Sequence, residues 1–92
     1  MSEDVGWRLR VAAPAARKIA EVLPETVAAA VIEFITGALL ENPHRVGRAL
    51  RHELTCLHAA RRGTFRVVYR IDEDEHFVEV IDVAHRSDIY RN

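Results

Sequence analysis

The clearest pattern in the chain is an alternation of apolar and basic side chains over residues 65–71, Phe-Arg-Val-Val-Tyr-Arg-Ile. β-Branched and aromatic residues predominate in this segment, as they do in strands. Because successive side chains of a strand point to opposite faces, one face would be apolar and the other would carry Arg66, Val68 and Arg70. An arginine in such a strand is costly unless it is paired or faces water. The pattern therefore predicts either a salt-bridged edge strand or a strand that directs arginine at phosphate.

Two more segments show a period of two. Residues 7–11 alternate Trp, Leu and Val with two arginines, which is typical of a half-buried strand. Residues 77–83 form the last predicted strand and follow an acidic turn at residues 72–75. The side chains expected on one face of that last strand are Phe77, Glu79, Ile81 and Val83.

A hairpin is predicted in the middle of the chain. Residues 54–60 are a predicted strand, and residues 62–64 form a turn in which Gly63 supplies a backbone conformation that other residues rarely adopt. Because this strand and those at 65–71 and 77–83 follow one another with short links, we expect an antiparallel meander.

Helical spacing occupies the region between the first two strands. Pro14 suits the first turn of one helix, which ends at Pro24. A second, longer helix begins there, because apolar residues recur three and four positions apart over residues 27–39. The Asn-Pro pair at residues 42–43 ends it. Residues 44–52 are predicted to form a basic loop.

The predicted order is strand, helix, helix, strand, strand, strand, in a single domain over residues 1–92. This order predicts an α+β fold, in which a twisted antiparallel β-sheet of about four strands has an N-terminal β-α-α hairpin packed on one face. The opposite face of the sheet, or the groove beside it, would be free for a ligand.

The net charge of −1 argues against a nucleic-acid binder, but the distribution of charge points the other way. Between residues 43 and 70 there are seven arginines and a single acid, Glu53. Guanidinium groups match phosphate oxygens with paired hydrogen bonds, so this window predicts an RNA-binding surface. The alternative interpretation is a solvated basic face. The candidate contact residues are Arg45, Arg48, Arg51, His58, Arg61 and Arg62.

Several function classes are excluded by what the chain lacks. The single cysteine, Cys56, excludes an internal disulfide, and no ligand spacing around it indicates a metal site. Residues 22–40 are interrupted by a proline and two glutamates, so they are not a membrane span. The acidic first residues are not followed by the apolar segment of a signal peptide. We therefore expect a cytoplasmic protein with neither metal nor other cofactor.

The last eight positions gather side chains that handle protons or phosphate, among them His85, Arg86 and Tyr90. A meander returns the end of the last strand alongside the strand that carries Arg66. Cleavage of RNA through its 2′-hydroxyl requires a base, a cation that stabilises the pentavalent phosphorane and an acid for the leaving 5′-oxygen. An aromatic face that stacks on a nucleobase would help to hold the scissile bond.

Residues 57–71, followed by an acidic turn, a strand and the end His-Arg-Ser-Asp-Ile-Tyr-Arg at 85–91, resemble the RelE/ParE superfamily of bacterial toxins. The chain is most similar to the RelE-like members of actinobacteria, and the resemblance covers nearly all of it. It implies a toxin of a type II toxin–antitoxin system, which enters the A site of the 70S ribosome and cleaves mRNA there without a metal. It also implies a co-encoded antitoxin, expected to be acidic and to bind DNA, that neutralises the toxin in a hetero-oligomer.

The resemblance also implies roles for individual residues. Arg66 falls at the strand arginine that contacts phosphate and the transition state, and Arg86 falls at the arginine assigned to the phosphate or leaving group. Tyr90 falls at the C-terminal tyrosine, which stacks on the base or handles a proton. His85 resembles a histidine that several relatives have in this region.

One departure from the family concerns the strand before the turn. The best-known RelE toxins have lysines there, whereas this chain has Leu-His-Ala-Ala at residues 57–60. The groups left for the role of general base are Arg61, Arg62, His58 and His85. A histidine is the better candidate, because the pKa of arginine exceeds about 12. The alternatives are a ParE-like poison of DNA gyrase, which shares the fold but does no RNA chemistry, and a catalytically weakened homologue that binds RNA or the ribosome.

Overall fold

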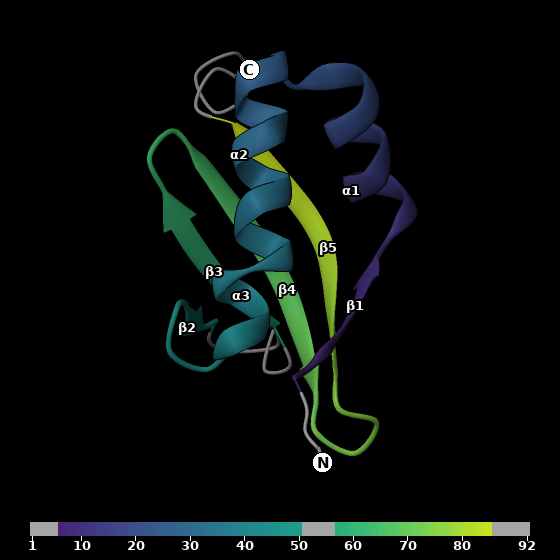
Figure 1. The fold of residues 1–92 in the computed structure, drawn as a ribbon, viewed down its shortest axis with the longest axis vertical. Helices are drawn as coiled ribbons and strands as arrows, with labels where there is room; N and C mark the ends of the chain where they lie inside the picture. Colours follow the sequence, from purple (N-terminus) through teal and green to yellow (C-terminus); the bar gives the residue numbers. More distant parts are fainter. Residues whose placement is uncertain (1–5, 51–56, 86–92) are drawn as a thin grey trace.

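A computed structural model describes residues 6–50 and 57–85 of the chain (Figure 1). Five strands form one sheet, and helices lie across one of its faces. In chain order the elements are β1 (Arg8–Val11), α1 (Ala13–Arg17), the π-helical turn η1 (Lys18–Val22), α2 (Glu25–Thr36), α3 (Ala38–Glu41), β2 (Arg48–Ala49), β3 (Leu57–Arg62), β4 (Phe65–Asp72) and β5 (Phe77–His85). None of the helices described is long and apolar enough to cross a membrane.

The predicted α+β class and meander are confirmed, because β3, β4 and β5 follow one another as antiparallel neighbours. The sheet order is β1-β5-β4-β3-β2. The structure differs from the predicted antiparallel sheet of about four strands in two details. β1 pairs parallel with β5, and a fifth strand, β2, lies inside the segment predicted as a loop and pairs with β3 at two positions. A strand of two residues has no periodicity by which a sequence pattern could reveal it.

The hairpin between β3 and β4 is tighter than predicted. β3 continues to Arg62 and β4 begins at Phe65, so Gly63 and Thr64 alone form the loop. Gly63 has a φ of 55°, which confirms the conformation predicted for it. Residues 54–56 of the predicted strand lie outside the described residues.

The core lies between the sheet and the helices that cover it. Phe65, Val67 and Tyr69 of β4 are buried, as their alternation predicted. The helix side chains in the same apolar cluster are Val31, Phe34, Ile35 and Leu39. Complete burial of a side chain of this size stabilises the fold by about 1.5–3 kcal/mol. The apolar stripe of the second helical segment therefore fixes α2 along the sheet, as Figure 1 shows.

The face predicted for β5 is wrong because the strand contains a β-bulge. Val68 pairs with Asp82 and Tyr69 with Val80, so the register shifts by one residue at Ile81. Val80 and Val83 are therefore both fully buried, although they are three positions apart.

Both helical segments are also less regular than predicted. The first ends in the π-helical turn η1, just before Pro24. The second is interrupted at Gly37, between α2 and α3.

Candidate nucleic-acid interface

The face of the sheet that the helices leave uncovered is called the open face here. Arg61 of β3 lies directly opposite Arg66 of β4, and Ala84 of β5 flanks Arg66 on its other side. Ala59 and Val68 form the next pair along the two strands. Directly opposite residues project from the same face. The open face therefore presents two adjacent arginines over a floor of small apolar side chains.

Within the described part of the chain, neither Arg61 nor Arg66 has a carboxylate partner. Two guanidinium groups directly opposite each other repel, so the pair is an electrostatic cost to the free protein. An anion placed between them would relieve that repulsion. The pair is therefore suited to bind a phosphate group.

The alternative of a salt-bridged strand applies to a different arginine. Arg70 also projects from β4 on the open face, and its guanidinium lies 3.0 Å from Glu79 and 3.7 Å from Asp72. It also lies 5.3 Å from the centre of the Phe77 ring. Arg70 thus forms ion pairs within the fold, whereas Arg66, four residues earlier, forms none with the described residues.

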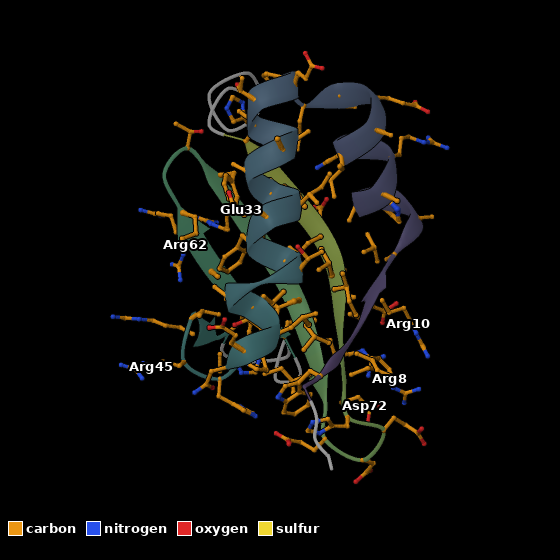
Figure 2. The ribbon with its side chains drawn as sticks, in the orientation of Figure 1. Arg8, Arg10, Glu33, Arg45, Arg62 and Asp72 are labelled. Atoms are coloured by element: carbon orange, nitrogen blue, oxygen red, sulfur yellow. The ribbon has the colours of Figure 1, made fainter. Side chains whose placement is uncertain are left out.

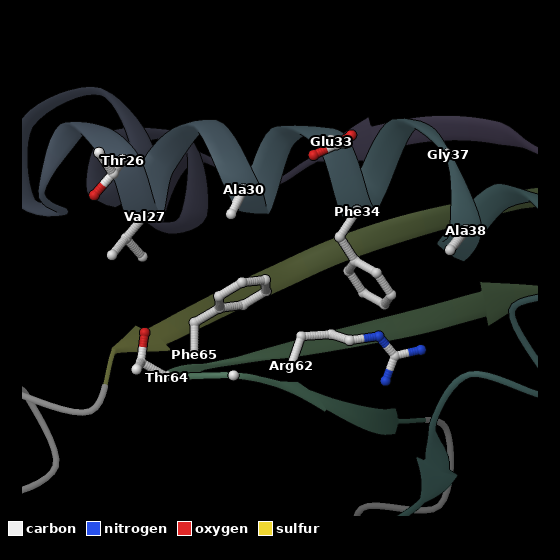
Figure 3. A pocket seen from close by; sticks show the side chains of 11 residues that line it. Thr26, Val27, Ala30, Glu33, Phe34, Gly37, Ala38, Arg62, Thr64 and Phe65 are labelled. Atoms are coloured by element: carbon white, nitrogen blue, oxygen red, sulfur yellow. The ribbon is translucent and has the colours of Figure 1, made fainter.

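Arg62 belongs to the covered face, because neighbouring residues of a strand point to opposite sides. Its guanidinium lies 4.8 Å from the centre of the Phe34 ring of α2, and it donates a hydrogen bond to the Arg61 carbonyl at 3.0 Å. Figure 3 shows this side chain reaching along the groove between α2 and the β3–β4 hairpin. The sequence grouped Arg61 with Arg62, but the structure separates them onto opposite faces.

The groove itself has a volume of about 740 Å³. Val27 and Phe34 of α2 and Phe65 of β4 form its apolar walls, while Glu33 and Arg62 place opposite charges at its rim (Figure 3).

Residues 42–49, called the basic arm here, contribute two more arginines. Arg48 pairs with Ala59 and therefore lies on the open face, one strand beyond Arg61. Arg45 lies in the turn before β2 and points away from the ribbon in Figure 2. Neither guanidinium has an ion-pair partner among the described residues. Arg51, the third predicted arginine of this segment, lies outside those residues.

His58, a candidate contact and base, lies on the covered face. Its ring stacks on Tyr69 at 5.4 Å between centres, and its Nδ1 is buried without a hydrogen-bond partner in the part of the chain that the structure describes. Burial, and secondarily the nearby His44, lowers the pKa of His58, while Glu73 opposes this shift. The neutral form of His58 is therefore favoured, and its surroundings are those of a packed side chain.

The C-terminal candidates fall at and beyond the end of β5. The register places His85 opposite Phe65, on the covered face. The residue before it, Ala84, lies opposite Arg66. Arg86 and Tyr90 lie outside the described residues. By register, the residues next to Arg66 on the open face are Arg61, Ala59, Val68, Ala84 and Asp82, and none of them is a histidine. Among the described residues no cluster of His, Cys, Asp and Glu is suited to a metal ion.

Sequence reasoning missed two arginines of the open face. Arg8 and Arg10 of β1 pair with Phe77 and Glu79 of β5. Arg10 lies 4.1 Å from the centre of the Phe77 ring, and Arg8 donates a hydrogen bond to the Glu75 carbonyl at 2.7 Å (Figure 2). Their alternation with apolar residues was visible in the sequence, but the parallel pairing that brings them to this face was not.

A small sheet with helices on one face and the other face open is the architecture that the RelE-like resemblance predicts. The family model described as the ParE toxin of type II toxin-antitoxin system, parDE, matches residues 10–90. The chain therefore belongs to this family of toxins.

Two toxins of Mycobacterium tuberculosis are similar over most of the sequence. Toxin RelE is 52% identical over 91 residues, which are 99% of this chain and 93% of that protein. Toxin RelG is 49% identical over 76 residues, which are 83% of this chain and 87% of that protein. The chain is thus a RelE-like toxin of a type II toxin–antitoxin system.

Solved structures agree with this assignment. The M. tuberculosis toxin–antitoxin complex RelBE2 contains a chain that is 43% identical, with a TM-score of 0.84, over 89% of this chain and all of that one. A mutant of Escherichia coli toxin RelE in the free state has a TM-score of 0.71 at 20% identity, over 94% of this chain and 88% of that one. At that identity the similarity concerns the fold alone.

Proposed function

We propose that this toxin inhibits translation by cleaving mRNA in the A site of the ribosome. The observation that carries the proposal is the pair Arg61 and Arg66, directly opposite each other on the open face and without a carboxylate partner in the described chain. Such a pair fits a phosphate whose negative charge increases during reaction. Family membership and the 52% identity to a protein named Toxin RelE support the same interpretation.

In the proposed reaction the 2′-oxygen of a nucleotide attacks its own 3′-phosphate. The new P–O2′ bond forms as the P–O5′ bond breaks, which leaves a 2′,3′-cyclic phosphate and a 5′-hydroxyl. One proton leaves the 2′-hydroxyl and one reaches the 5′-oxygen, so no metal or redox partner is required. Arg66 and Arg61 stabilise the phosphorane, while His85, Arg86 and Tyr90 are assigned to proton transfer, the leaving group and base stacking.

The proposed partners follow from the same assignment. Solved complexes pair related toxins with RelB antitoxins, and we propose a cognate antitoxin of acidic, DNA-binding type for this chain. The ribosome is the other partner, which implies a cytoplasmic site of action. Arg45 and Arg48 of the basic arm, with Arg51 beyond it, are proposed to contact RNA phosphates.

The test is primer extension on mRNA from cells that briefly express the wild type, Arg66→Gln or Arg70→Gln. The two variants carry the same substitution on the same face of β4, but Arg70 already has carboxylate partners. We expect cuts within translated codons for the wild type and Arg70→Gln, and loss of these cuts for Arg66→Gln. The cuts should also disappear when translation initiation is blocked. Equal cutting by Arg66→Gln and wild type would contradict the assignment.

A second candidate function is that of a ParE-like gyrase poison. It is favoured by the name of the matching family and by the absence of a histidine next to Arg66 on the described open face. The same experiment separates the two functions, because growth arrest with intact mRNA would favour the gyrase poison.

A further inference from the structure

The basic arm has few bonds of its own that would hold it in place. Its turn contains two backbone hydrogen bonds, in which the amides of Arg45 and Val46 donate to the Asn42 carbonyl at 3.1 and 3.3 Å. β2 adds two paired positions at the edge of the sheet. The free energy that keeps Arg45 and Arg48 in a fixed position must therefore come mainly from contacts with the rest of the protein.

One of those contacts reaches the centre of the core. Tyr69 of β4 is fully buried, and its hydroxyl donates a hydrogen bond of 2.6 Å to the carbonyl of Pro43, which is itself fully buried. Burial raises the pKa of Tyr69 to about 12, so the phenol remains a donor at neutral pH. The hydrogen bond joins the arm to the same strand that carries Arg66.

The other end of the arm fits closely against the same hydroxyl. A Cβ atom at Gly47 would collide with the Tyr69 hydroxyl and would lie 2.7 Å from the Ala59 carbonyl of β3. Only glycine lets the chain pass between the phenol and β3 without displacement. The next residue, Arg48, then enters the pairing that aligns it with Ala59 on the open face.

Aromatic contacts surround this anchor. The His58 ring stacks on the Tyr69 ring, and His44 of the arm lies edge-on to His58 at 6.2 Å and to Trp7 at 5.8 Å. His44 also lies 2.8 Å from Glu73 of the β4–β5 turn. These contacts hold the His44 side chain of the arm, while the Tyr69 hydroxyl holds the arm's backbone.

We propose that Tyr69 is a positioning residue, which fixes the basic arm so that Arg48 lies opposite Ala59, on the same face as Arg61 and Arg66, and Arg45 extends the cationic surface. The inference rests on the proposed function, in which these arginines contact RNA. Tyr69 points to the covered face and does not touch RNA itself. β4 thus has a different function on each face, because Arg66 contacts the phosphate and Tyr69 holds the arm.

The test compares Tyr69→Phe with the wild type, alone and in an Arg45→Ala/Arg48→Ala background, on ribosomes programmed with a short mRNA. The variant keeps the aromatic ring and loses one hydroxyl. We expect KM to rise about three- to tenfold, as for the loss of one or two positioned phosphate contacts, with kcat within about twofold of the wild type. The slope of log KM against log salt should fall by about one to two.

In the Arg45→Ala/Arg48→Ala background the same substitution should change neither KM nor the salt slope. Val83→Ala is the control for a general loss of stability, because Val83 is fully buried on β5, three strands from β2. We expect Val83→Ala to leave KM unchanged at a temperature well below its melting point. An additive effect of Tyr69→Phe in the double-alanine background, or an equal rise in KM for Val83→Ala, would overturn the inference.

Amide hydrogen exchange measures the arm independently of RNA. Tyr69→Phe should increase exchange in residues 42–50, including the Leu50 amide that donates to the Leu57 carbonyl at 2.8 Å, and leave β4 and β5 unchanged. Unchanged exchange in the arm would refute the anchoring. If the wild type itself does not cleave mRNA on ribosomes, the proposed function fails, and faster exchange in the variant would still establish the anchor. Gly47→Ala should reproduce both the faster exchange and the higher KM.

Discussion

Arg61 and Arg66 have no carboxylate partner among the described residues, which predicts that one substitution will stabilise the protein while it abolishes the proposed activity. Arg66 faces Arg61 directly, so Arg66→Gln removes a repulsion. Arg70→Gln removes ion pairs to Glu79 and Asp72 instead. Both variants replace arginine by glutamine on the same strand and face, so the change in β-strand propensity is similar in the two and largely cancels when they are compared. The free energy of unfolding should therefore change in opposite directions in the two variants.

The size of each effect follows from simple electrostatics. Two unit charges about 8 Å apart interact by about 0.5 kcal/mol in water. With a Debye length of about 8 Å at physiological salt, the repulsion falls to about 0.2 kcal/mol. For Arg70→Gln we expect a loss of about 1–2 kcal/mol, because Glu79 is only 20% exposed and would lose its charged partner.

Thermal unfolding followed by circular dichroism measures both changes. For a chain of this length, 1 kcal/mol corresponds to about 4–8 °C in Tm. Arg66→Gln should therefore raise Tm by about 2–4 °C at low salt, with the gain shrinking as salt is added. Arg70→Gln should lower Tm by about 4 °C or more. A decrease in Tm for Arg66→Gln comparable to that of Arg70→Gln would refute the reasoning, because Arg66 would then take part in structural bonding.

Three further predictions concern the stability of the fold. The pKa of His58 is lowered in the folded protein, so below about pH 6.5 the unfolded chain binds more protons than the folded chain. The free energy of unfolding should therefore fall with decreasing pH in this range. His58→Gln should flatten this part of a stability curve measured with denaturant. Leu39→Ala should cost about 2–5 kcal/mol in urea unfolding, whereas Ile32→Ala, at a side chain 47% exposed, should cost far less. Gly63→Ala should lower the free energy of unfolding by about 1 kcal/mol through the backbone alone, because apart from the adjacent residues no heavy atom lies within 4 Å of the new methyl group.

Strands and helices with a regular pattern of apolar side chains were predictable from the sequence, whereas the irregularities within them were not. The alternation in β4 gave its buried face, and the apolar stripe at residues 27–39 gave α2. The bulge at Ile81 moved the buried face of β5, because a bulge depends on pairing with β4 as well as on the strand's own pattern. The parallel pairing of β1 with β5 likewise depends on how the helices return the chain across the sheet.

The candidate site was predictable by residue type but not by face. Alternation requires Arg61 and Arg62 to lie on opposite sides of β3, but only the packing of α2 decides which side is covered. Arg62 then packs on Phe34, while Arg61 joins Arg66. For the same reason His58, one strand position from Ala59, lies against Tyr69 and not on the open face.

This division of faces has a consequence for the proposed chemistry. Around Arg66 the described open face supplies positive charge but no histidine, since His58 and His85 both belong to the covered face by register. Guanidinium groups are not deprotonated in proteins, so on the proposed function Arg66 would act by electrostatic stabilisation. On the proposed function, Arg66→Gln should lower cleavage by a similar factor at all pH values. Substitution of the proton-transfer groups assigned to the chain beyond Ala84 should instead change the shape of the pH–rate profile.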